Sequence, residues 1–84
     1  MNPSASYSCL LQTPSVQTYR ALRVGAGLSA KSDAAAERGL PNTLFAVQVL
    51  HGDEVIGMGR VIGDGGCFYQ VVDIAVLPAH QGQG

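Results

Sequence analysis

The pattern of hydrophobic and polar positions begins with a short extended stretch and then becomes helical. Residues 6–12 (SYSCLLQ) form an apolar run closed by Thr13-Pro14, long enough for a strand and too short for a stable helix. Ser15 is a suitable N-cap for a helix that starts at residue 16. One helical stripe comes next, at the spacing i, i+3, i+6 and i+7: Val16, Tyr19, Leu22 and Arg23. We therefore expect a strand and then a helix that ends near the glycines at 25 and 27.

An alanine-rich second helix is expected over residues 33–38. Either Ser29 or Ser32 can cap its start, and Gly39 followed by Pro41 marks its end. The residues between the two helices form a glycine-containing joint.

The chain then changes to an extended pattern. Residues 44–50 (LFAVQVL) and 54–62 (EVIGMGRVI) flank the turn segment 51–53, which predicts a hairpin. A glycine-rich turn at 63–66 leads into residues 67–77 (CFYQVVDIAVL), the longest strand signal of the chain. The predicted order is β-α-α-β-β-β: an α+β fold in which two helices pack against a mainly antiparallel meander.

Composition excludes several classes of protein. The chain has 84 residues, 46% hydrophobic and 13% charged, which suits one globular domain spanning residues 1–84. The net charge is −1 and the basic residues are scattered, so we expect no nucleic-acid partner. No apolar run is long enough to span a bilayer, and we expect a cytoplasmic protein without membrane contact. Cys9 and Cys67 lie in apolar segments, where free cysteines usually behave as small core residues.

The C-terminal segment 72–84 (VDIAVLPAHQGQG) combines a strand, a proline and a polar loop with alternating glycines. Such a loop suits a diphosphate, because small residues let the main chain approach the ligand and successive N–H groups point into one concavity. Taken alone, the pair Gly82 and Gly84 is weak evidence, since glycine pairs are common in turns.

In this context the segment resembles the GNAT superfamily of N-acetyltransferases. The cofactor signature of that family is Gln or Arg, two residues, Gly, one residue, and then Gly or Ala. Gln81 and Gly84 fill the first two fixed positions, and the third would fall two residues beyond Gly84. The resemblance covers the whole chain, including Leu40-Pro41 before the second strand. It implies that the chain is the N-terminal half of a GNAT fold, an incomplete domain ending inside the pyrophosphate loop.

The resemblance also implies where acetyl-CoA would bind. In such proteins the pantetheine arm bonds to the main chain of the fourth strand, here at Ile74, Ala75 and Val76. The pyrophosphate would contact four loop residues: Gln81, Gly82, Gln83 and Gly84. By position alone, Leu28 and Ser29 in the joint between the helices would lie beside the acceptor amine.

The general base is left open. The position that resembles the family's usual base is Gln70, whose amide cannot accept a proton, so a water chain, Asp73 or residues beyond the sequence would serve. Asp73 interrupts an apolar strand, and hydrogen bonding to neighbouring backbone is the alternative to a catalytic role. His51 is expected in a solvated turn, and His80 in the loop could bond a phosphate. No metal site is expected.

The resemblance implies an acyl-CoA-dependent N-acetyltransferase that moves an acetyl group from acetyl-CoA to a primary amine of a small molecule or peptide. We expect the isolated chain to be inactive, because it lacks the rest of the site. The alternative is a non-catalytic CoA-binding or self-associating half-domain. In that case the long apolar strand 67–77 would be an open edge through which the chain pairs, for example as a homodimer.

Overall fold

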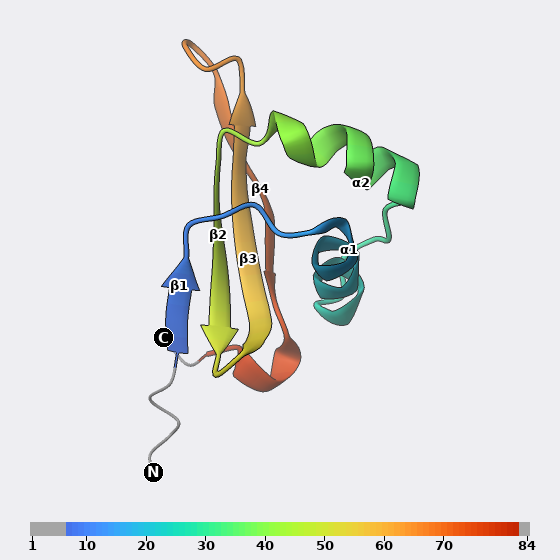
Figure 1. Ribbon diagram of the computed structural model, residues 1–84, viewed down its shortest axis with the longest axis vertical. Coiled ribbons are helices and arrows are strands. Elements are labelled where there is room, and N and C mark those ends of the chain that lie inside the picture. The colour runs from blue at the N-terminus through green and yellow to red at the C-terminus, as the bar shows by residue number, and fades with distance from the viewer. Residues whose placement is uncertain (1–6, 83–84) are drawn as a thin grey trace.

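The computed structural model describes residues 7–82 as an α+β fold in which a four-stranded sheet carries two helices (Figure 1). The helices and strands follow in the order β1 (Tyr7–Leu10), α1 (Val16–Gly25), α2 (Asp33–Gly39), β2 (Phe45–His51), β3 (Glu54–Gly63) and β4 (Tyr69–Val76). Short 3₁₀ turns follow α2 and β4. The predicted order of elements and the predicted fold class are confirmed. Within residues 7–82, no helix is long and apolar enough to cross a membrane.

The strands form an antiparallel meander with the spatial order β1-β2-β3-β4. Gly52 in the turn between β2 and β3 has φ +63°, and Gly65 in the turn between β3 and β4 has φ +80°. Glycine adopts this left-handed conformation at little cost, which is why both glycine-containing segments turn the chain as predicted.

Both helices cover the same face of the sheet, on the right in Figure 1. Their N-caps are Ser15, which accepts a hydrogen bond from the Thr18 amide, and Ser32, which accepts one from the Ala35 amide. The buried core between helices and sheet consists of Tyr19, Leu22, Ala36, Leu40, Met58 and Ala75. The predicted stripe on α1 thus faces the core.

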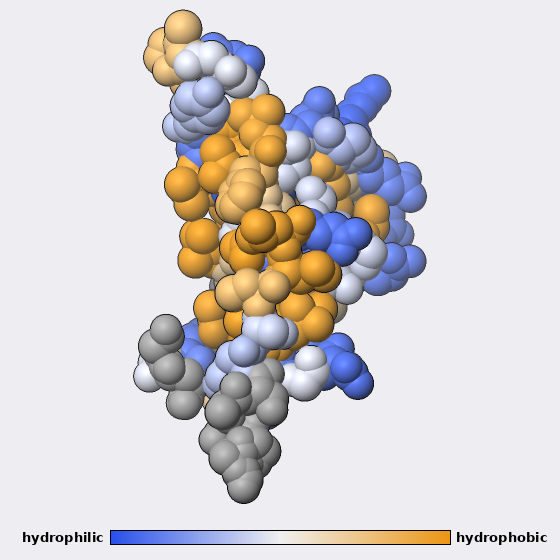
Figure 2. Space-filling view, turned by 60° about the vertical axis from the view of Figure 1, so that its left-hand side comes forward, coloured by the Kyte–Doolittle hydropathy of each residue, from blue (hydrophilic) through white to orange (hydrophobic). Residues whose placement is uncertain are grey.

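The opposite face of the sheet is apolar and uncovered within the described residues. Because Ala75 points towards the helices, its neighbours Ile74 and Val76 point to the other face. There they lie over two glycines of β3: a Cβ on Gly59 would be 2.8 Å from Ile74 Cδ1, and one on Gly57 would be 3.5 Å from Val76 Cγ2. Figure 2 shows a band of hydrophobic side chains along this side, with Ile74 61% exposed.

A β-bulge interrupts β4 at Asp73. Met58 pairs with Ala75 and Arg60 pairs with Val72, so two residues of β4 lie opposite Gly59 of β3. Asp73 has φ +57°, and it is the one described residue other than glycine with a positive φ. Aspartate tolerates this conformation better than most residues, but it still needs support from its surroundings.

Some details predicted from the sequence were wrong. Cys9 and Cys67 are both exposed, not core residues. The last strand begins at Tyr69 instead of Cys67. The reason is Asp64, whose carboxylate accepts hydrogen bonds from the backbone amides of residues 66–68 and keeps them in the turn.

The aromatic side chains of Phe45 and Tyr69 are exposed on their strands. Within the described residues 7–12, the first strand is shorter than the sequence predicts and ends at Leu10.

Candidate functional site

The outer edge of β4 is the first part of the candidate site. Within residues 7–82, β4 pairs with β3 on one side and has no strand on the other. The Leu77 amide donates to the Ile56 carbonyl of β3 over 2.9 Å. The Val76 carbonyl instead accepts from the side-chain amide of Gln81, also over 2.9 Å. In an antiparallel strand, the N–H and C=O groups of successive residues point to alternate sides. Those of Val76 therefore point to the open edge, and those of Ala75 point to β3.

The loop after β4 is the second part. Pro78–His80 forms a 3₁₀ turn, and Gln81 then returns to extended backbone. Gly82 has φ +79°, and a side chain placed on it would meet no atom within 4 Å. Gln83 and Gly84, the other two predicted pyrophosphate contacts, lie outside the described residues. The described part of the loop is therefore accessible backbone that begins directly after the open edge of β4.

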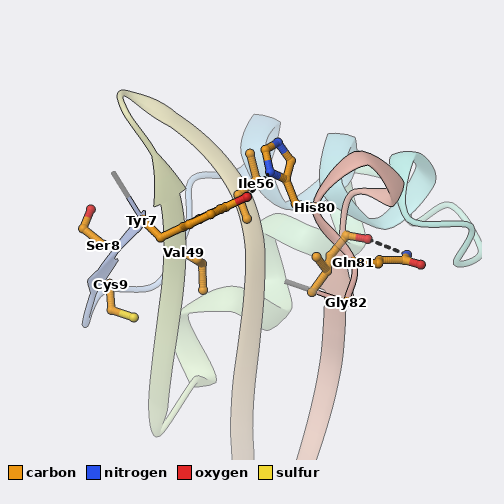
Figure 3. A pocket seen from close by; sticks show the side chains of 9 residues that line it. Tyr7, Ser8, Cys9, Val49, Ile56, His80, Gln81 and Gly82 are labelled. Atoms are coloured by element: carbon orange, nitrogen blue, oxygen red, sulfur yellow. Dashed lines mark hydrogen bonds between the residues drawn. The ribbon is translucent and has the colours of Figure 1, made fainter. Parts of the chain in front are cut away.

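A groove of about 490 Å³ lies between this loop and the uncovered face of the sheet (Figure 3). It is lined by Tyr7, Ser8, Cys9, Val49, Ile56, Val76, His80, Gln81 and Gly82. Most of its wall is apolar, and its polar side chains come from β1 and from the loop.

Two histidines and a tyrosine meet at the end of this groove. The Tyr7 hydroxyl is hydrogen-bonded to His80 Nδ1 over 2.8 Å. The ring of His51 lies 4.7 Å from that of Tyr7 and 5.0 Å from that of His80, between centroids. His51 is thus a half-buried residue at the end of β2, not the solvated turn residue that we expected. No sequence pattern indicates this cluster, because its members come from segments far apart in the chain.

The joint between α1 and α2 contains the predicted acceptor residues. Leu28 is partly exposed, and its amide donates to the Arg23 carbonyl at the end of α1. Ser29 accepts two hydrogen bonds from the Arg23 guanidinium, 2.8 Å from Nε to its carbonyl and 3.0 Å from Nη2 to its hydroxyl. Arg23 therefore fixes this joint against the helix.

Asp73 lies between two arginines from different elements. Its Oδ1 accepts from Arg23 Nη1 over 2.5 Å and from the Tyr19 hydroxyl over 3.0 Å. Its Oδ2 accepts from Arg60 Nη1 over 2.7 Å. The side chains of Asp73, Arg23 and Arg60 are 6%, 10% and 8% exposed. We call these three residues and Tyr19 the Asp73 cluster.

The environment of Asp73 holds its carboxyl group in the charged form. Burial by itself would raise the pKa of Asp73, but the hydrogen bonds from Arg60, Tyr19 and Arg23 outweigh it, and the pKa is lowered. Burial and the hydrogen bond to Asp73 raise the pKa of Tyr19. A carboxylate held by two guanidinium groups is a weak proton acceptor, so these contacts favour the structural interpretation of Asp73 over the catalytic one. Its partners are side chains of α1 and β3, not the neighbouring backbone that we expected.

Metal ligands are not gathered anywhere in the described chain. Among residues 7–82, no group of three or more histidine, cysteine, aspartate or glutamate side chains could hold a metal ion.

The model of the acetyltransferase (GNAT) family matches residues 13–84, which is most of the chain. The chain belongs to the GNAT acetyltransferase family. A search of curated proteins found no significant match.

Solved structures of GNAT proteins agree with this assignment. A protein of unknown function from meticillin-resistant Staphylococcus aureus, called a probable acetyltransferase, is 53% identical with a TM-score of 0.86 over 92% of this chain. A GNAT family acetyltransferase from Streptococcus pneumoniae is 29% identical, with a TM-score of 0.78 over 93% of this chain. A GNAT family protein from Xanthomonas campestris, 22% identical with a TM-score of 0.68 over 92% of this chain, shares the fold. The chain spans 58% of the length of each of these three proteins.

The GNAT site residues predicted from the sequence thus fall into two groups in the structure. In the first group, the Val76 carbonyl is hydrogen-bonded to the side chain of Gln81 in the loop. Ser29 is linked to Asp73 through Arg23, and Asp73 directly precedes Ile74. Arg23 and Arg60 were not predicted as parts of the site. The signal that was available is their placement: Arg23 lies on the apolar stripe of α1 and Arg60 in the mostly apolar strand β3. Each therefore needs an acidic partner, as Asp73 needs a basic one.

Proposed function

We propose that this chain serves an N-acetyltransferase reaction in which an acetyl group passes from acetyl-CoA to a primary amine of a small molecule or peptide. Membership in the GNAT acetyltransferase family supports the reaction class. The observation that carries the proposal is the open edge of β4, which is followed after one 3₁₀ turn by the accessible backbone at Gly82. An extended ligand can bond to such an edge as an added strand would.

The residues present fit the pantetheine and diphosphate parts of acetyl-CoA. The Val76 carbonyl already accepts a donor from outside the sheet, the Gln81 amide, so it can accept one from a ligand. We propose that the backbone of β4 at Ile74–Val76, chiefly at Val76, holds the pantetheine arm. Gln81 and Gly82, with Gln83 and Gly84, would hold the pyrophosphate through backbone N–H groups. When bound, acetyl-CoA supplies an acetyl group activated as a thioester.

The acceptor amine would enter beside Leu28 and Ser29, because the Asp73 cluster places this joint next to the start of the Ile74–Val76 segment. An amine attacks the thioester in its neutral form. Since two guanidinium groups hold the Asp73 carboxylate, we propose that Asp73 supports the strand and that water takes up the proton of the amine.

Calorimetric titration of acetyl-CoA into the chain tests the binding site. Gly82→Ala places a side chain on a left-handed residue in the loop, and we expect it to weaken acetyl-CoA binding at least about tenfold, as loss of one to two good hydrogen bonds to a charged group would. Gly65→Ala is the matched control, since Gly65 has nearly the same φ and equally open surroundings but lies in the turn between β3 and β4. Equal binding by the wild-type chain and both variants would contradict the site.

Turnover is tested by the release of free CoA thiol with a panel of primary amines of small molecules and peptides. Amine-dependent thiol release above the hydrolysis background supports the transferase proposal. Because we expect this chain by itself to be inactive, the assay uses a full-length form of the protein. Acetyl-CoA binding by that form without amine-dependent release, over the whole panel, would contradict the transferase proposal and leave a CoA-binding module.

The second candidate is self-association through β4. The exposed side chains of Tyr69, Val71 and Ile74 along an open edge favour it. Light scattering after size exclusion should then show a mass that rises with concentration, and Val71→Lys should restore the monomer. Val24→Lys, which changes a similarly exposed valine on α1, is the control. A monomer at all concentrations would exclude this candidate.

A further inference from the structure

Arg23 makes contacts in two directions at once. From the end of α1, its Nε and Nη2 donate to Ser29 in the joint between the helices, over 2.8 and 3.0 Å. Its Nη1 donates to Asp73 in the bulge of β4 over 2.5 Å. The side chain is 10% exposed, so these bonds are made largely out of water. One rigid, planar guanidinium therefore joins two segments that are far apart in the sequence.

The end of this linkage on β4 is a strained position. Asp73 has φ +57° in the bulge, and its conformation sets the direction in which the backbone of Ile74–Val76 continues along the open edge. A left-handed aspartate persists when its surroundings fix it, and here three side chains do so. Loosening one of them should change the path of the edge backbone.

We propose that Arg23 is a positioning residue that couples the joint at residues 26–30 to the edge backbone at residues 73–76, so that order at one segment favours order at the other. This inference rests on the proposed function, in which the joint faces the acceptor and the edge holds acetyl-CoA. Arg23 touches neither ligand in this scheme, and it acts through Ser29 and Asp73. The coupling would allow bound acetyl-CoA to order the side where the amine enters.

Arginine suits this role better than lysine would. The bonds of Arg23 leave from three different nitrogens, which diverge in one plane towards Ser29 and Asp73. A lysine ammonium is a single point charge, and at this position it can replace the bond to one of these partners but not the pair. Arg23→Lys therefore keeps the charge and breaks the linkage.

Amide hydrogen exchange on this chain, read in peptides covering residues 26–30 and 73–76, tests the linkage without any ligand. Arg23→Lys should speed exchange in both segments by at least about fivefold, the lower end of typical couplings between sites. The matched control is Arg20→Lys. Arg20, 42% exposed, donates to the Lys31 carbonyl and to Asp33, and none of its described contacts reaches β4. Arg20→Lys should speed amide exchange near residues 31–33 and leave amide exchange in β4 unchanged.

The outcomes separate a linkage from a local anchor. If Arg23→Lys speeds exchange at 26–30 but not at 73–76, Arg23 holds the joint alone and the inference is wrong. Unchanged exchange in both segments is also against it. Arg23→Gln, which removes the charge as well, should give the same pattern with a larger effect.

Amide exchange in the presence of acetyl-CoA is a second measurement, and a purely structural role of Arg23 would not affect its result. Binding at β4 should slow exchange at residues 26–30 in the wild-type chain, because coupling is reciprocal. In Arg23→Lys, acetyl-CoA should still bind, at reduced affinity, but without slowing exchange at 26–30. Equal slowing in both proteins overturns the inference and leaves the proposed function standing. Absence of acetyl-CoA binding in the wild-type chain overturns the proposed function, and the ligand-free exchange then still decides whether the linkage exists.

Discussion

Two aspartates, one before β4 and one within it, each accept three hydrogen bonds, and they do so in opposite ways. Asp73 is bonded by side chains of residues 19, 23 and 60, which are remote in the sequence. Asp64 is bonded by the backbone amides of residues 66, 67 and 68, its near neighbours. The Asp73 cluster joins α1, β3 and β4. The segment 64–68, which we call the Asp64 turn, shapes one loop. A carboxylate can therefore organise tertiary structure or local structure with the same number of bonds.

The pKa of each aspartate is lowered, and the causes differ in the same way. Backbone hydrogen bonds, first from Phe68 and then from Gly66 and Cys67, lower the pKa of Asp64 in an exposed turn. Burial works against the charged form of Asp73, and the hydrogen bonds from Arg60, Tyr19 and Arg23 outweigh it. Removing Asp64 exposes amides that water can bond, whereas removing Asp73 leaves buried charges without a partner.

The largest expected effect is that of Asp73→Ala. It leaves the guanidinium groups of Arg23 and Arg60 buried and close to each other without a negative charge, and breaking a buried pair in this way costs about 3–5 kcal/mol of unfolding free energy. For a small domain this is much of the total stability. Urea unfolding followed by circular dichroism measures it.

A surface pair serves as the control for that measurement. Asp33→Ala removes the partner of Arg20, with side chains 69% and 42% exposed, and should cost less than about 1 kcal/mol. If Asp73→Ala costs no more than Asp33→Ala, then the Asp73 cluster does not hold the elements together.

The next largest loss of stability is expected for Gly63→Ala, which tests the close approach of Gly63 to Phe68 at the two ends of the Asp64 turn. A Cβ on Gly63 would lie 2.0 Å from the Phe68 carbonyl oxygen, and Gly63 has φ +153°. The backbone must move to make room, at about 1–3 kcal/mol as for other overpacked sites. Gly66→Ala is the control, since its Cβ would meet no atom closer than 3.8 Å and its φ is not positive. Thermal unfolding of both variants should show a lower Tm for Gly63→Ala alone.

The two regions also differ in how far the sequence could predict them. The Asp64 turn was predicted at residues 63–66 because Asp-Gly-Gly is a local signal, although the length of the turn was not. The helix stripe, the N-cap at Ser15 and the order of strands were predicted for the same reason: spacing and caps are local properties.

The Asp73 cluster could be predicted in part. An aspartate in an apolar strand needs partners, but the partners lie 13, 50 and 54 residues away, and no periodicity connects them. The bulge that brings them together depends on the register of β4 against β3, which the pattern of β-formers does not fix. The same holds for the meeting of Tyr7, His51 and His80 at the groove.

Acid should weaken the fold, and Asp73 should account for most of the effect. A carboxyl whose pKa is lower in the folded than in the unfolded state contributes stability that is present above its unfolded pKa, about 4, and is lost as the pH falls through its folded pKa. Urea unfolding at a series of pH values from 7 down to about 2 measures this loss. Asp64 contributes with the same sign, because its pKa is lowered too. The Asp64→Ala chain keeps Asp73 and should still lose stability in acid, whereas Asp73→Asn should give a flatter dependence of stability on pH. A profile for Asp73→Asn as steep as that of the wild-type chain would assign the acid effect to other groups.

The smallest effect is expected for Asp64→Ala. Its carboxylate orders three backbone amides in an exposed turn, and without it water bonds these amides while Gly63 and Gly65 still bend the chain. Asp64→Asn should be milder still, because the side-chain carbonyl of asparagine can accept the same bonds. Amide exchange should therefore quicken at residues 66–68 in Asp64→Ala, with the Tm nearly unchanged. A loss of Tm as large as that of Asp73→Ala would mean that the turn, and not the buried cluster, fixes the register of β3 and β4, because no other described contact of Asp64 reaches beyond its loop.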